Sequence, residues 1–110
     1  MIVHLVLFSP RPDLAETEQA DVRDTLQRAL TEIPSVRSYK VGRRVRLGTA
    51  YDRAAPIDFE FLVTIEVDDE RSLSDYLSHP AHQKLGQLFY ETSAHALASD
   101  FHLVDVSSLR

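Results

Sequence analysis

The chain has 110 residues, no cysteine and a formal net charge of −5. Its length is typical of one domain, so we expect residues 1–110 to form a single domain with one core. The lack of cysteine excludes disulfides, thiolate nucleophiles and cysteine-bound zinc or iron–sulfur centres. The negative charge argues against nucleic acid as a partner, because nucleic-acid binding needs basic surfaces that neutralise phosphates.

The first half begins with a short apolar run, residues 2–8, which predicts a buried strand ended by prolines at positions 10 and 12. This run is too short to cross a bilayer, has no basic flank and precedes no cleavage site. We therefore expect no membrane association and a cytoplasmic location. A helix follows, with Thr17 as a candidate N-cap and Pro34 as its stop. Its inward stripe is Val22, Leu26, Ala29, Leu30 and Ile33.

The remaining elements alternate strand and helix. We predict strands over 36–45 and 59–67, joined by a loop over 47–57, and a last strand over 98–106. Between the strands over 59–67 and 98–106, Ser72 resembles a capping residue for a short helix, and Pro80 is well placed to start a longer helix. With right-handed crossovers, this order predicts an α+β, ferredoxin-like protomer with a four-stranded antiparallel sheet and helices on one face.

The residues best suited to chemistry lie in the segment Tyr76-Leu77-Ser78-His79-Pro80-Ala81-His82. Histidine titrates near physiological pH, so two imidazoles beside a phenol could form a proton-transfer site. His82 is the best candidate because it begins a helix that faces the sheet. His79 and His82 could also be metal ligands, but their spacing across a helix start is a weak metal signal, and we expect no metal site.

Each of these side chains also has a structural explanation. His4, on the first strand, could be a hydrogen-bonded core histidine. Tyr76 could simply pack with its hydroxyl at the surface. His79, immediately before Pro80, could fix the junction between two helices. The sequence alone leaves these alternatives open.

Several motifs together resemble the stress-responsive dimeric A/B barrel (Dabb) family. They are the apolar first strand with His4, the Ile33-Pro34-Ser35-Val36 turn, Val41-Gly42, and the Tyr76–His82 segment. The resemblance covers essentially the whole chain. It implies a protomer that pairs sheet to sheet with a second copy, and hence a homodimer with a dimeric α+β barrel.

The resemblance also implies an activity. In olivetolic acid cyclase-type members, which close a linear polyketide by an aldol reaction without metal or organic cofactor, the acid–base pair falls on Tyr76 and His82. A first-strand histidine falls on His4. A further pocket histidine falls on Phe61, which is a departure from that pattern. We expect an apolar or aromatic carbonyl ligand, in contact with residues that also include Val63, Leu85, Phe89 and His79.

Three functions follow from these observations. The first is a cofactor-independent cyclase or lyase that acts on a polyketide-like or other carbonyl compound. The second is a non-catalytic, stress-responsive dimer that binds a small apolar ligand. The third is a cofactor-independent monooxygenase on a related dimeric barrel, which rests on shared topology alone. A pocket lined by both Tyr76 and His82 would favour the first function, and a cavity filled by Phe61 would favour the second.

Overall fold

The computed structural model describes residues 1–110 and shows one four-stranded sheet. The strands are β1 (Ile2–Pro10), β2 (Ser38–Arg43), β3 (Phe61–Val67) and β4 (Ser93–His102). Their order across the sheet is β2-β3-β1-β4, and all neighbours are antiparallel. The predicted ferredoxin-like protomer is therefore confirmed, with β1 in the centre and β4 at one edge.

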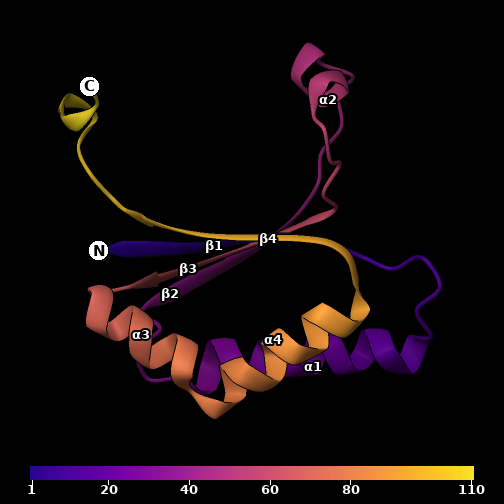
Figure 1. Ribbon diagram of the computed structural model, residues 1–110, viewed down its shortest axis with the longest axis horizontal. Helices are drawn as coiled ribbons and strands as arrows, with labels where there is room; N and C mark the ends of the chain where they lie inside the picture. Colours follow the sequence, from indigo (N-terminus) through magenta and orange to yellow (C-terminus); the bar gives the residue numbers. More distant parts are fainter.

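Three helices cover one face of the sheet (Figure 1). They are α1 (Glu16–Glu32), α3 (Glu70–Ser78) and α4 (Pro80–Thr92), and α1 packs against α4. The alternation of β1 and β3 sends one apolar row of each strand toward these helices. The core between the two layers consists of Ile2, Phe8, Ala29, Leu30, Ile33, Val63, Ile65, Val67, Tyr76 and Leu85.

The starts of two helices differ from the prediction. Helix α1 has Ala15 rather than Thr17 as its N-cap, and the Glu18 carboxylate accepts from the Ala15 N–H at 3.2 Å. Helix α3 has Asp69 as its N-cap, and the Asp69 carboxylate accepts from the Ser72 N–H at 2.8 Å. Ser72 is thus the third residue of the helix, because an aspartate three residues earlier satisfies its amide. The predicted start of α4 at Pro80 is confirmed.

The strand boundaries are shifted as well. Strand β4 begins directly after α4, five residues before the predicted start at Ala98, because the ladder with β1 extends back to Pro10 and Ser93. It ends at His102 rather than Val106, because His102 pairs with Ile2, the first residue of β1. Beyond this pair, the Leu103 N–H donates only to the Met1 carbonyl oxygen. The expected loop at 47–57 contains a short helix, α2 (Ala50–Ala54).

The second face of the sheet carries no helix. From the strand registers, its side chains include Val3, Leu5 and Leu7 of β1, next to Leu97 and Phe101 of β4. On β3 this face carries the polar residues Thr64 and Glu66, but β1 and β4 make the centre of the face apolar.

Two arms project on this same side, opposite the helices (Figure 1). The α2 arm comprises residues 45–59, and the C-terminal arm comprises residues 103–110, which end in a 3₁₀ turn, Val106–Ser108. Both arms expose large apolar side chains, such as Leu47 at 79% and Val106 at 76%.

None of the helices has the length and apolar character needed to cross a membrane.

Candidate active site

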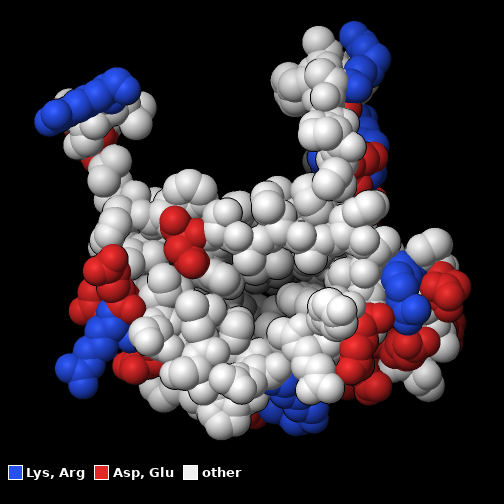
Figure 2. All heavy atoms as spheres, viewed as in Figure 1, with Lys and Arg blue, Asp and Glu red and all other residues white.

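A cavity of about 400 Å³ lies between the helices and the inner face of the sheet. Figure 2 shows it as a hollow surrounded by uncharged atoms, between α4 and β4. The space exists because the side chains that border it there are small: Ala96 and Ala98 on β4, and Gly86 on α4. A Cβ atom built on Gly86 would meet no heavy atom within 4 Å.

Three aromatic rings meet at this cavity, from three different elements. His4 comes from β1, Tyr76 from α3 and His82 from α4, and all three line the cavity. The ring centroids of Tyr76 and His82 are 4.8 Å apart, and that of His4 lies 5.6 Å from Tyr76 and 6.2 Å from His82. The helix junction at Pro80 makes this possible, because it turns the chain between Tyr76 and His82 so that both face the sheet.

Tyr76 is almost completely buried, with 1% of its surface exposed. Its hydroxyl makes no hydrogen bond to another protein group. Unlike the hydroxyls of Ser35 and Ser93, which are fully buried without a partner, the Tyr76 hydroxyl is not completely enclosed. The phenol oxygen is therefore left to face the cavity. Burial raises the pKa of Tyr76 well above its usual range, so the group stays a neutral hydrogen-bond donor at neutral pH.

His82 is held by its own helix junction. Its Nδ1 atom lies 3.0 Å from the Leu77 carbonyl oxygen, which can only accept, so Nδ1 carries the proton. Burial lowers the pKa of His82, and the neighbouring His4 lowers it further, against the opposing effect of the Leu77 hydrogen bond. The ring is therefore neutral at pH 7, and its Nε2 lone pair remains free to accept a proton.

His4 is paired with Asp100, a residue that the sequence analysis did not identify. The His4 Nδ1 atom lies 2.6 Å from an Asp100 carboxylate oxygen, and the two residues are directly opposite in the β1–β4 ladder. His4 is 5% exposed, so this carboxylate fixes the orientation of a nearly buried ring. The pair was not predicted, because the last strand was expected to start at Ala98 and its register against β1 was unknown.

The predicted ligand-contacting residues fall into two groups. Val63, Leu85 and Phe89 line the cavity with the three rings. Phe61 does not; it lines a neighbouring pocket, where its ring lies 5.4 Å from that of Phe8. His79 is the N-cap of α4, and its Nδ1 accepts from the Ala81 N–H at 3.1 Å, which fits its structural explanation. No three His, Asp or Glu side chains gather where they could hold a metal ion.

Comparison with solved structures identifies similar folds at low sequence identity. A dimeric ferredoxin-like protein of unknown function from Thermobifida fusca has a TM-score of 0.71 and 24% identity, covering 93% of this chain and 90% of its own. A Dabb family protein from Mesorhizobium loti has a TM-score of 0.74 and 19% identity, with coverage of 94% and 97%. A hydroxynitrile lyase from Passiflora edulis has a TM-score of 0.79 and 12% identity, with coverage of 96% and 94%.

At these identities the structural matches establish the fold alone. Among curated proteins, no sequence matches this chain. The family comparison is more informative, because residues 2–103 match the Stress responsive A/B Barrel Domain family, Dabb, and this range includes His4, Tyr76, His82 and Asp100. The chain therefore belongs to the Dabb family.

Proposed function

We propose that this protein is a cofactor-independent acid–base enzyme, a cyclase or lyase that makes or breaks a carbon–carbon bond next to a carbonyl group. The observation that carries the proposal is the pairing of Tyr76 with His82 at an apolar cavity, with ring centroids 4.8 Å apart. Burial moves the pKa of Tyr76 up and that of His82 down. One group is thereby kept as a proton donor and the other as a base, which is the division of roles that acid–base catalysis needs.

The reaction would run as follows for an intramolecular aldol cyclisation. Nε2 of His82 removes a proton from the carbon beside a carbonyl, and the Tyr76 hydroxyl donates a hydrogen bond to the oxygen of the resulting enolate. The enolate carbon attacks a second carbonyl carbon and forms the new bond. The proton on His82 then passes to the new alkoxide, so the base is regenerated. A lyase would use the same steps in reverse.

His4 and Asp100 support this chemistry by position. Asp100 accepts from Nδ1 of His4, so the Nε2 side of the His4 ring is left for the ligand or for the other two rings. The remaining cavity wall is apolar, as expected for an aromatic or other apolar carbonyl compound.

We also propose that the working form is a homodimer that joins the two uncovered sheet faces. The apolar row that includes Leu5, Leu7 and Phe101 would otherwise stay in water, and the two arms project on the same side as this row. Exposed apolar patches of this kind mark interaction surfaces. The similar protein from Thermobifida fusca is dimeric, which supports the proposal of a dimer.

A proton-exchange assay tests the catalytic proposal without knowledge of the natural substrate. The protein is incubated in D₂O with 1-phenylbutane-1,3-dione, and deuterium uptake next to the carbonyls is followed by NMR. We expect exchange well above the buffer rate, and a loss of about 100-fold or more in His82→Gln. His95→Gln is the matched control, because His95 is an exposed histidine on β4. A parallel assay with an aromatic cyanohydrin examines the lyase direction, which the Passiflora edulis neighbour makes worth including.

The outcome separates the enzyme from a binding protein. If the carbonyl compounds shift the NMR signals of His82 and Tyr76 but no exchange is catalysed, the cavity binds ligand and the catalytic proposal is wrong. If His95→Gln and His82→Gln lower the exchange rate equally, the assay is reporting general imidazole catalysis rather than this site.

A further inference from the structure

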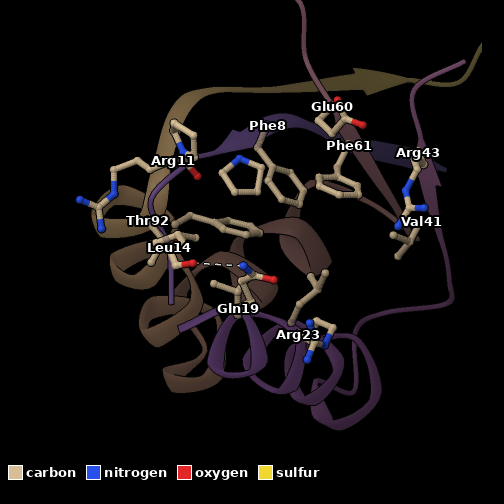
Figure 3. Close-up of a pocket in the computed structure, with 16 residues that line it drawn as sticks. Phe8, Arg11, Leu14, Gln19, Arg23, Val41, Arg43, Glu60, Phe61 and Thr92 are labelled. Atoms are coloured by element: carbon tan, nitrogen blue, oxygen red, sulfur yellow. Dashed lines mark hydrogen bonds between the residues drawn. The ribbon is translucent and has the colours of Figure 1, made fainter. Parts of the chain in front are cut away.

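A second pocket, of about 570 Å³, lies beside the cavity described above and has a different character. Its apolar surface is aromatic: the Phe8 ring lies 4.7 Å from that of Phe89 and 5.4 Å from that of Phe61 (Figure 3). Leu26 and Phe89 line both pockets, so they form part of the wall between them. None of the three catalytic candidates lines this second pocket.

The rim of this pocket is positively charged, although the chain as a whole is acidic. Arg23 of α1 lies at the bottom of the pocket and Arg43 of β2 at its right edge (Figure 3); both are exposed, and neither is engaged in an ion pair. The Arg43 guanidinium carbon lies 5.7 Å from the centre of the Phe61 ring, a cation–π distance that orients this cation over the aromatic surface.

The other charged residues at the rim are engaged in ion pairs. Arg11 lies on the side opposite Arg43, points away from the pocket, and pairs with Glu18 at 3.6 Å. Glu60, the only acidic residue in the lining, accepts from Arg46 at 2.9 Å. Arg23 and Arg43 are therefore the charged residues of the lining that have no ion-pair partner.

We propose that this pocket is a binding site for an apolar carboxylate, with its hydrocarbon or aromatic body against Phe8, Phe61 and Phe89 and its carboxylate at the rim, where the cations of Arg23 and Arg43 attract it. Guanidinium groups match carboxylates in shape as well as charge, since two parallel N–H groups meet two oxygens. The pocket volume lies within the range that small-molecule sites occupy. This inference does not rest on the proposed catalysis, because the two sites have different polar groups.

The test uses the full chain, labelled with ¹⁵N, and two probes of the same shape. 2-Naphthoate carries the carboxylate and 2-naphthamide is its neutral counterpart. We expect naphthoate to shift the amide signals of Gln19 and Val41, which line only this pocket, and to bind at least about tenfold more tightly than naphthamide. Arg23→Gln and Arg43→Gln should each weaken naphthoate binding by about three- to tenfold, because both arginines are solvent-exposed.

The controls make the result specific. Arg11→Gln should leave naphthoate binding unchanged, since Arg11 is paired with Glu18 and faces away. Naphthamide binding should not respond to any of the three substitutions. The proposal is overturned if both probes bind equally well, if naphthoate binds the Arg23 and Arg43 variants as tightly as the parent, or if only His82 and Leu85 signals shift. The last result would place the ligand in the other cavity and would leave the proposed catalysis untouched.

Discussion

Removal of the Tyr76 hydroxyl separates a structural role of this side chain from a chemical one. The ring is 1% exposed and belongs to the core, whereas the hydroxyl has no protein partner. In Tyr76→Phe no hydrogen bond is lost, so we expect the free energy of unfolding to change by less than about 0.5 kcal/mol. In Tyr76→Ala the whole ring is lost from the core, which should cost about 3–5 kcal/mol.

The assay is urea unfolding at one fixed protein concentration, because the stability of a dimer depends on concentration. If Tyr76→Phe is destabilised by more than about 1.5 kcal/mol, the hydroxyl makes a structural hydrogen bond and our description of the site is wrong. If the variant is as stable as the parent, it becomes a clean probe of catalysis. We then expect it to lose about 10²- to 10³-fold in deuterium exchange, the usual effect of one oxyanion donor.

Four further predictions concern stability and assembly. Folding lowers the pKa of His82 from its usual value of 6.5, so the unfolded chain binds a proton at a higher pH than the folded protein does. The free energy of unfolding should therefore decrease as the pH falls below about 6.5. Urea titrations of His82→Asn should show a smaller decrease. Leu5→Asp should give a monomer in light scattering, whereas Gln27→Asp, on the exposed side of α1, should not. Gly86→Ala should raise the unfolding free energy by about 0.5–1 kcal/mol in thermal melts, since its Cβ has open space around it. Asp69→Ala should lower the unfolding free energy by about 1 kcal/mol in urea, because α3 loses its N-cap.

The fold was predictable because most of its strands and helices carry a clear local pattern. The alternation in β3 and the helical stripe of α1 are both visible in the sequence, and Pro80 marks the start of α4 without ambiguity. The ends of elements were less predictable, because several residues compete for each cap. Asp69 and Ser72 are both good N-cap residues, and only the folded backbone shows that the Ser72 amide bonds to Asp69.

The site was predictable where its residues belong to motifs that the sequence shows, which include the first-strand His4. Tyr76 and His82 lie in one short segment, and both line the cavity. Asp100 was missed because its role depends on strand register, which follows from where β4 begins. Phe61 was assigned to the same ligand surface as Leu85, but it lies nearer the end of the sheet, in register with the last part of β1. Sequence position gives the face of the sheet, and only the register gives the place along it.

The contact between His4 and Asp100 also has a consequence for biosynthesis. The two residues are 96 positions apart, at opposite ends of the chain, and they join the central strand to the edge strand. Such distant pairings slow folding, because a long loop must close before any contact rewards it. On a ribosome that adds 5–20 residues per second, the first strand would wait roughly 5–20 s for its partner. Until Asp100 has been synthesised, His4 lacks its carboxylate partner and the edge of β1 that pairs with β4 stays open.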